Sequence, residues 1–212
     1  LSLLHVEAPV FAGPRLAVKT AIDLGAAAAL MVLLSPLFAV LALLVRRHDK
    51  GPVFFRQERI GKDGNAFPML KFRTMVVGAE AMLPSLMERS EGQGPLFKLS
   101  DDPRITRIGA FLRRYSLDEL PQLVNILRGQ MSLVGPRPPL PNEVETYAND
   151  VRRRLLVKPG MTGLWQINGR SDLSWEESVR FDLYYVENWS VMSDLMILWR
   201  TGRSVLQASG AY

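Results

Sequence analysis

The feature that most constrains this chain is Leu24–Val45, an apolar run of 22 residues that contains no charged side chain. A helix rises about 1.5 Å per residue, so a run of this length is able to cross a hydrocarbon core about 30 Å thick. The run therefore predicts a membrane-embedded segment, although a buried helix of a soluble domain can have the same composition.

Ser35-Pro36 interrupts this run near its centre. Pro36 lacks the N–H that would donate to the carbonyl of Val32, and the Ser35 hydroxyl is able to bond a carbonyl one turn earlier. We therefore predict two short helices joined at a break, within a membrane segment over residues 19–47. Basic residues flank both ends of this segment and draw both toward the cytoplasm: Arg15, Lys19, Arg46, Arg47 and Lys50. This pattern favours a re-entrant helix-break-helix over a proline-kinked transmembrane helix.

Residues 48–212 are expected to form one compact domain. The chain is 48% hydrophobic and 22% charged, which is sufficient for a core. Residues 1–18 are expected to be an N-terminal linker, and the start at Leu1 rather than Met is compatible with a longer polypeptide. The predicted fold is α+β and dominated by helices: strands at 52–57 and 67–72, a turn at 61–65, an exposed loop at 90–104, and helices at 76–89, 105–115, 142–157, 175–188 and from 191 onwards.

Two of the predicted helices are amphipathic. In residues 105–115, Ile108, Phe111 and Leu112 recur at helical spacing beside several arginines. The last helix has a broad apolar face that includes Trp199. Such helices either lie on an anionic membrane surface or pack their apolar stripe on the core. The sequence leaves both arrangements open.

Composition limits the chemistry that this chain can perform. Cysteine is absent, and His5 and His48 are the only histidines. Disulfides, thiolate metal sites and cysteine nucleophiles are therefore excluded, and a histidine-based triad has little to work with. Catalysis must rest on carboxylates, hydroxyls and basic side chains. The net charge of +5 suits a partner that carries phosphates, whether nucleotide, nucleic acid or anionic lipid.

The adjacent acids Asp118 and Glu119 stand before an apolar helical run. Ser116 and Glu119 match a capping box, which by itself would explain the acids as helix-start residues. Pro121 would then lie inside the helix, where its ring disfavours helical structure. A helix that begins near Pro121 is therefore favoured, and it would leave the two acids on an exposed turn.

Two further strings place cations where phosphate could bind. Pro136-Arg137-Pro138-Pro139 predicts a rigid extended loop that presents one guanidinium, whose planar fork matches phosphate oxygens. Lys71 and Arg73 occupy alternate positions, on one face of a predicted strand. Taken alone, the first string could be a proline-rich connector and the second a solvated strand edge.

Together these strings resemble the bacterial sugar transferase family, the monotopic phosphoglycosyl transferases, over nearly the whole chain. The matching strings are GPVFFRQERIG at 51–61, KFRTM at 71–75, SLDELPQLVNILRGQMSLVGPRP at 116–138, KPGMTGLWQINGR at 158–170 and FDLYYVENWS at 181–190. The WQINGR string and the terminal Gly-Ala-Tyr are most similar to the branch that loads galactose-1-phosphate or glucose-1-phosphate on undecaprenyl phosphate.

By this resemblance, Asp118 is the nucleophile that attacks the sugar-linked phosphorus of a nucleotide sugar, and Glu119 is a ligand of Mg²⁺. Mg²⁺ prefers one or two carboxylates with substrate phosphate oxygens, and Asp182 is expected to be the second carboxylate. The family's helix break falls on Ser35 and Pro36. The other matching positions are expected to bind substrate or phosphate: Lys71, Arg73, Arg137, Gln166 and Arg170.

The resemblance implies an enzyme at the cytoplasmic face of the bacterial inner membrane, with residues 48–212 as its cytoplasmic catalytic domain. It would transfer a hexose-1-phosphate from a UDP-sugar to undecaprenyl phosphate through a covalent aspartyl-phosphosugar, and so prime exopolysaccharide, capsule or O-antigen synthesis. Expected partners are the UDP-sugar, undecaprenyl phosphate and membrane lipids, a homodimer is allowed, and no nucleic acid is expected. Three alternatives stay open: a membrane-anchored scaffold, a nucleic-acid-binding domain, and a nucleotide-sugar hydrolase that differs only in its acceptor.

Overall fold

A computed structural model describes residues 13–87, 99, 101–169 and 173–207 of the chain. Helices dominate this part, and its strands form two small sheets of two strands each. The predicted helix-dominated α+β class is therefore confirmed. Most of the loop predicted at 90–104 lies outside the described residues.

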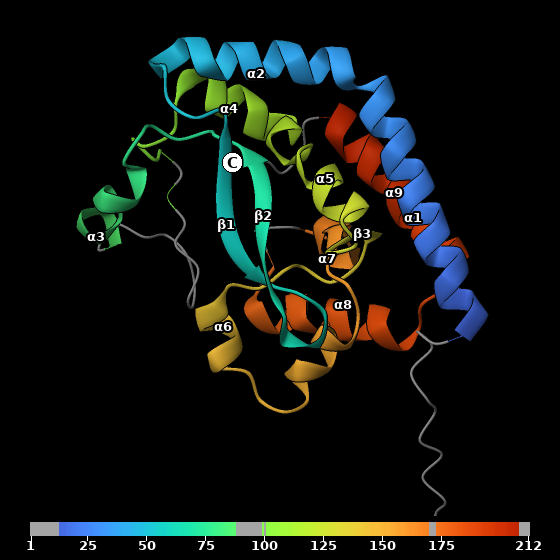
Figure 1. The fold of residues 1–212 in the computed structure, drawn as a ribbon. Helices are drawn as coiled ribbons and strands as arrows, with labels where there is room; N and C mark the ends of the chain where they lie inside the picture. The colour runs from blue at the N-terminus through green and yellow to red at the C-terminus, as the bar shows by residue number, and fades with distance from the viewer. Residues whose placement is uncertain (1–12, 88–98, 100, 170–172, 208–212) are drawn as a thin grey trace, which may run out of the picture.

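The N-terminal half of the described chain opens with a bent helical arm, made of α1 (Gly13–Leu33) and α2 (Ser35–Asp49) with Leu34 between them. Figure 1 shows α2 crossing the top of the molecule and α1 descending along one side. The Ser35 hydroxyl donates to the carbonyl of Val32 at 2.8 Å. This bond fills the acceptor that Pro36 leaves without a backbone donor. The predicted helix break is therefore confirmed, and its cause is local.

The arm buries one face against the domain and exposes apolar side chains on the other. Ala27, Leu41 and Val45 are buried. The exposed face carries large hydrophobic side chains along both helices: Val18, Ile22, Leu24, Leu30, Val32, Leu33, Val40, Leu43 and Leu44. In the described part of the chain, α1 alone is long and apolar enough to cross a membrane. The re-entrant path stays a prediction.

The start of α1 differs from the predicted boundary at residue 19, because the helix already begins at Gly13. Its first turns are fixed by buried polar contacts rather than by apolar packing. The Lys19 ammonium lies 2.7 Å from Asp194 of the last helix, and Asp23 accepts from the Ser132 hydroxyl at 2.7 Å. These long-range pairs attach the arm to the domain.

A β-hairpin forms the centre of the domain. β1 (Phe54–Ile60) pairs antiparallel with β2 (Ala66–Phe72), and a short turn at Lys62–Gly64 joins them. Both strands and the turn were predicted. Phe55 lies opposite Lys71 in the register, and cross-strand partners project from the same face of a sheet.

The second sheet lies beside the hairpin and is parallel. β3 (Ser132–Val134) pairs with β4 (Gly160–Thr162). A Cβ on Gly160 would lie 2.1 Å from the backbone nitrogen of Gly135, so only glycine allows this approach. The close contact fixes the start of the proline-rich loop that follows β3.

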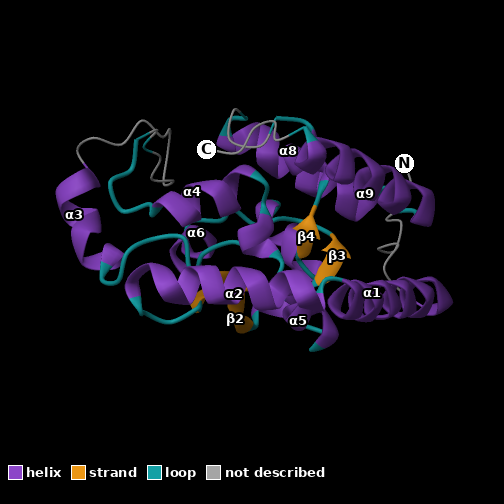
Figure 2. Cartoon of the chain, turned by 90° about the horizontal axis from the view of Figure 1, so that it is seen from above, coloured by secondary structure: helices purple, strands orange, loops and turns teal. Residues whose placement is uncertain are grey.

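Short helices surround the two sheets, as Figure 2 shows with the arm on one side of the strands and α8 and α9 on the other. The prediction of one helix over 142–157 is wrong, because residues 146–150 are not helical and separate two short helices. Asn149 and Asp150 favour turns there. The helix predicted at 76–89 is reduced to two short turns. The elements are η2 (Ala79–Met82), α3 (Leu83–Leu86), α4 (Arg107–Arg114), η4 (Leu117–Glu119), α5 (Gln122–Leu127), α6 (Pro141–Glu145), η5 (Val151–Leu156), α7 (Leu164–Ile167), α8 (Trp175–Glu187) and α9 (Val191–Leu206).

The two predicted C-terminal helices are confirmed. Ser174 caps α8 in a capping box with Glu177, and the Ser190 hydroxyl caps α9. The amphipathic helix α4 buries Leu112 and leaves Phe111 exposed, so it packs on the core and still carries an apolar residue outward. The core forms two clusters, one under α1 that includes Phe67, Leu123 and Ile197 and one under α2 that includes Leu41, Phe72 and Leu112.

Candidate active site

The two adjacent acids lie in η4, a single 3-10 turn between α4 and α5. Ser116 before it has a left-handed backbone with φ of 53° and its side chain caps nothing. The helix α5 begins only after Pro121. The capping-box interpretation of Ser116 is therefore wrong, and the predicted helix start near Pro121 is confirmed.

The prediction that both acids lie on an exposed turn is wrong for Asp118, which is 7% exposed. The turn packs against β2 and α4, so it points one acid inward. Burial raises the pKa of the Asp118 carboxyl, and the neighbouring Lys71 opposes this rise. Glu119 raises the pKa further, whereas Arg113 lowers it.

Lys71 of β2 lies between the two acids. Its Nζ is 2.7 Å from Oε1 of Glu119 and 4.0 Å from Oδ2 of Asp118. The structure therefore brings together three of the predicted site residues, from two elements that are distant in sequence. One cation lies near two carboxylates, so the turn carries more negative charge than the Lys71 ammonium neutralises.

Arg73 does not join this group. It follows the last residue of β2, and its guanidinium pairs with Asp49 at the end of α2 and donates to the carbonyl of Pro52 at 2.6 Å. Arg73 lowers the pKa of the Asp49 carboxyl to about 2. The sequence grouped Lys71 with Arg73, but the contacts of Arg73 fasten the arm to the hairpin, and its substrate role stays a prediction.

Arg137 lies in the loop after β3, as predicted, but its guanidinium already has a carboxylate partner. Its two terminal nitrogens lie 2.8 and 3.3 Å from the Glu143 oxygens. The Glu143 side chain is 1% exposed, whereas that of Arg137 is 20% exposed. This fork-to-fork pair holds the guanidinium in a fixed plane at the surface of the loop.

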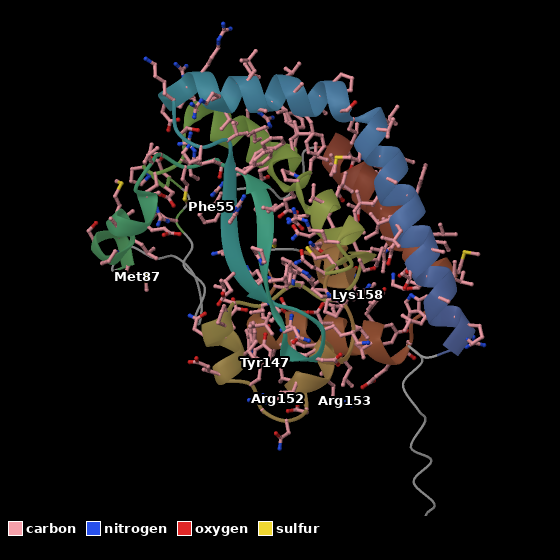
Figure 3. All side chains as sticks on the ribbon, in the orientation of Figure 1. Phe55, Met87, Tyr147, Arg152, Arg153 and Lys158 are labelled. Carbon is pink, nitrogen blue, oxygen red and sulfur yellow. The ribbon has the colours of Figure 1, made fainter. Side chains whose placement is uncertain are left out.

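Asp182 of α8 lies beneath the same loop. It pairs with Arg154 and accepts from the backbone N–H of Arg137 at 3.3 Å. Burial raises the pKa of the Asp182 carboxyl to about 6, against the opposing effect of Arg154. The Arg154 guanidinium also donates to the Tyr147 hydroxyl at 2.9 Å. Tyr147 is labelled in the lower part of the view in Figure 3. This cluster supports the Arg137 loop from inside.

Among the described residues, no three histidine or acidic side chains gather as a metal site. The structure pairs Asp182 with Arg154, and Glu119 with Lys71. The metal role predicted for Asp182 therefore stays a prediction. Gln166 of α7 donates to the carbonyl of Met161 at 3.1 Å, which places it at β4, and Arg170 lies outside the described residues.

Sequence reasoning missed the partners that hold the predicted residues. Glu143 and Arg154 are both buried, and each fixes a predicted site residue. Arg113 acts on the charge of Asp118 and donates to the Thr74 hydroxyl at 2.9 Å. A charged residue within an otherwise apolar helix face is the signal that could have found Arg113. No comparable local signal marks Glu143.

Comparison with known proteins gives a consistent picture. The family model described as bacterial sugar transferase matches residues 14–208. The chain is 49% identical to a UDP-galactose-lipid carrier transferase of Erwinia amylovora, and 45% identical to an undecaprenyl-phosphate galactose phosphotransferase of Salmonella typhimurium. Each match covers 92% of this chain but 41% of the relative, so the chain spans less than half the length of these proteins. It is also 43% identical to the exopolysaccharide production protein ExoY of Sinorhizobium fredii, over 92% of this chain and 88% of that protein.

Proposed function

Because the chain belongs to the bacterial sugar transferase family, we propose that it transfers a hexose-1-phosphate from a UDP-sugar to undecaprenyl phosphate. The relatives' names supply the classes of substrate: a UDP-galactose-lipid carrier transferase and an undecaprenyl-phosphate galactose phosphotransferase. The observation that carries the proposal is the buried carboxylate of Asp118 beside Lys71. The product would be undecaprenyl-diphospho-sugar, the primer of an exopolysaccharide, capsule or O-antigen.

We infer that Asp118 is the nucleophile of the first step. An oxygen of its carboxylate attacks the sugar-linked phosphorus of the UDP-sugar, and a new O–P bond forms. The bond between that phosphorus and the bridging oxygen breaks, and UMP leaves with the electron pair. A carboxylate without a water shell is a stronger nucleophile than a solvated one, which burial of Asp118 favours.

In the second step, an oxygen of undecaprenyl phosphate attacks the same phosphorus. The bond to Asp118 breaks, and its carboxylate is regenerated. Both steps spread negative charge over phosphoryl oxygens, and cations near the reaction centre stabilise such charge. Lys71 lies 4.0 Å from Asp118, close enough to move from the carboxylates to a phosphoryl group. Arg137 is proposed to bind phosphate at the edge of the site.

The side chains at the turn fit a magnesium ion. Glu119 is 30% exposed in its side chain and follows Asp118 directly, and Mg²⁺ commonly uses one or two carboxylates with substrate phosphate oxygens. We propose that Glu119 holds Mg²⁺, which when bound would neutralise charge on the diphosphate. The Lys71 ammonium, which pairs with a Glu119 oxygen in this structure, would then leave Glu119 and contact the substrate.

The exposed apolar face of the arm supports a membrane location for this reaction. The lipid acceptor is anchored in the bilayer, and α1 and α2 present large hydrophobic side chains along the whole bend. We propose that the arm enters and leaves the inner membrane on its cytoplasmic side. Cysteines introduced at residues 12 and 63 should then both resist an impermeant thiol reagent applied from the periplasm, whereas labelling at residue 12 alone would indicate a single span.

The proposed activity is tested by offering purified protein a panel of UDP-sugars with undecaprenyl phosphate and Mg²⁺. UMP release and a lipid-linked sugar diphosphate should both appear, with one donor preferred. Continuous UMP release without the lipid would indicate a hydrolase. No UMP from any donor would favour the scaffold, and salt-sensitive retention on DNA would favour nucleic-acid binding.

A further inference from the structure

The hairpin carries a second cation on the face that holds Lys71. Gln57 and Arg59 are two residues apart in β1 and therefore project from one face. In the register, Phe55 lies opposite Lys71, and Arg59 lies opposite Phe67. Lys71 and Arg59 thus stand at opposite ends of the same face. Lys71 meets the acids of η4, and Arg59 meets the loop of Arg137.

The contacts of Arg59 are all with uncharged acceptors. Its Nε and one terminal nitrogen donate to the Gln57 side-chain oxygen at 3.2 and 2.6 Å. The other terminal nitrogen donates to the carbonyl of Pro138 at 2.9 Å. A guanidinium has five N–H donors, and two of those of Arg59 have no acceptor among the described residues. The backbone N–H of Ile60 also donates to the Pro139 carbonyl at 3.0 Å, which fixes the strand end against the loop.

Arg59 differs in this respect from three neighbouring cations. No carboxylate lies within salt-bridge distance of Arg59 among the residues that the structure describes. Three cations of this region each pair with one: Lys71 with Glu119, Arg137 with Glu143 and Arg154 with Asp182. Arg113 near Asp118 has no such ion pair among the described residues either, and it donates to the Thr74 hydroxyl. A cation that is largely withdrawn from water costs free energy unless an opposite charge accompanies it.

The charges that act on Arg59 come from both halves of the site, the Asp118–Glu119 turn and the Arg137 loop. Burial lowers its pKa to about 10, and the nearby Arg137 adds to this effect, whereas Glu143 and Glu119 oppose it. The guanidinium therefore keeps its charge at neutral pH. Its charge acts on Glu119 at one end of the site and on Arg137 at the other, although it contacts neither.

We propose that Arg59 binds a phosphoryl group of a substrate, between the Asp118–Glu119 turn and the Arg137 loop. This rests on the proposed function, since that function supplies the phosphates. The position suits either the diphosphate of the nucleotide sugar or the phosphate of the polyprenyl acceptor. The Gln57 amide and the Pro138 carbonyl hold the guanidinium plane, so Arg59 enters the reaction already oriented.

The test compares Arg59→Gln and Arg59→Lys with Arg56→Gln. Arg56 is an exposed arginine on the opposite face of the same strand, and it serves as the matched control. Arg59→Gln should lower kcat/KM at least about tenfold, which is about 1.4 kcal/mol, mainly through a higher KM. Arg59→Lys should recover part of this loss because it keeps the charge without the fork. Arg56→Gln should behave as the wild type.

Measuring the two half-reactions separately shows which substrate supplies the phosphate that Arg59 binds. In the first half-reaction, single-turnover UMP release is measured without lipid. If the Arg59 variants need a higher UDP-sugar concentration than the wild type for this release, Arg59 binds the UDP-sugar. A raised KM for undecaprenyl phosphate alone would assign it to the acceptor. Michaelis constants within about twofold of the wild type would overturn the proposal, even if Arg59→Gln lowered the Tm. If Arg59→Gln does not fold, Arg59→Lys decides by the same KM criterion.

A different measurement applies if the wild type releases UMP from no UDP-sugar. Inorganic pyrophosphate would then be titrated calorimetrically into the wild type, Arg59→Lys and Arg56→Gln. If pyrophosphate binds more weakly to Arg59→Lys but equally to the wild type and Arg56→Gln, the phosphate site is supported even though the proposed activity fails. Equal affinities, or no binding to the wild type, would overturn the phosphate site as well.

Discussion

Asp118 and Asp182 are both buried aspartates whose pKa is raised by burial, yet their surroundings differ. The Asp182 side chain is 1% exposed and pairs directly with Arg154, with a further bond from the backbone of Arg137. The Asp118 side chain is 10% exposed, and the nearest cation, Lys71, lies 4.0 Å away and binds Glu119 more closely. Both bonds of Asp182 reach Oδ2, and its buried Oδ1 has no hydrogen-bond partner among the described residues. Asp118 is held only loosely, by Lys71.

We propose that this difference separates a positioning acid, Asp182, from the reactive one, Asp118. A carboxylate that is 1% exposed and ion-paired with a buried guanidinium gains order, but its burial closes it to a substrate phosphate. A buried carboxylate that is loosely paired stays available to an electrophile, and its cation is free to follow the charge. The raised pKa alone therefore does not identify the nucleophile, since both aspartates share it.

The largest expected effect is on activity in Asp118→Asn. The amide keeps the size of the side chain but cannot form the acyl phosphate, so turnover should fall at least about 10⁴-fold, or about 5.5 kcal/mol. The Tm should stay near that of the wild type, because described residues make no close ion pair with Asp118. UMP release and thermal unfolding in the same detergent measure the two quantities. Substantial residual turnover would place the nucleophile elsewhere.

Asp182→Asn should show the opposite pattern. It leaves Arg154 buried without a charge partner, which is expected to lower the free energy of unfolding by about 3–5 kcal/mol. Denaturant titration measures this loss. The folded fraction should still form a covalent sugar phosphate on Asp118, though more slowly because the Arg137 loop loses its support. Stability equal to that of the wild type would contradict the structural role of Asp182.

A smaller effect is expected in the pH profile of Lys71→Met. Lys71 lowers the pKa of Asp118, and the nucleophile must be ionised. Removing the ammonium raises that pKa further, so activity should be lost at a higher pH as the solution is acidified. The measurement is kcat/KM against pH, with Lys62→Met in the hairpin turn as the control. An acid limb that does not move would separate Lys71 from Asp118.

Much of this architecture follows from local sequence patterns. Alternation and turn residues predicted the hairpin, helical patterning predicted α8 and α9, and Ser35-Pro36 predicted the break in the arm. These features depend on residues within about one turn or one strand of each other, so a single sequence contains their causes. The start of α5 after Pro121 is of the same kind.

The pairing of charges could not be predicted in this way. Arg73 was grouped with Lys71 by strand alternation, but the strand ends at Phe72 and Asp49 of the arm takes the guanidinium. Asp118 was expected on an exposed turn, but β2 and α4 cover it. Such outcomes depend on tertiary contacts between distant segments, which no local pattern encodes. Local patterns alone do not distinguish Asp118 from Asp182, and only the family resemblance assigned them different roles.

The most direct test of the account is to incubate the protein with a UDP-sugar alone and analyse it by mass spectrometry. The account predicts a burst of UMP equal to the active enzyme and a hexose phosphate on the peptide that contains Asp118, both lost in Asp118→Asn and retained in folded Asp182→Asn. Added undecaprenyl phosphate should then discharge the adduct. A protein that stays unmodified while it turns over both substrates would contradict covalent catalysis and would indicate direct attack by the lipid phosphate.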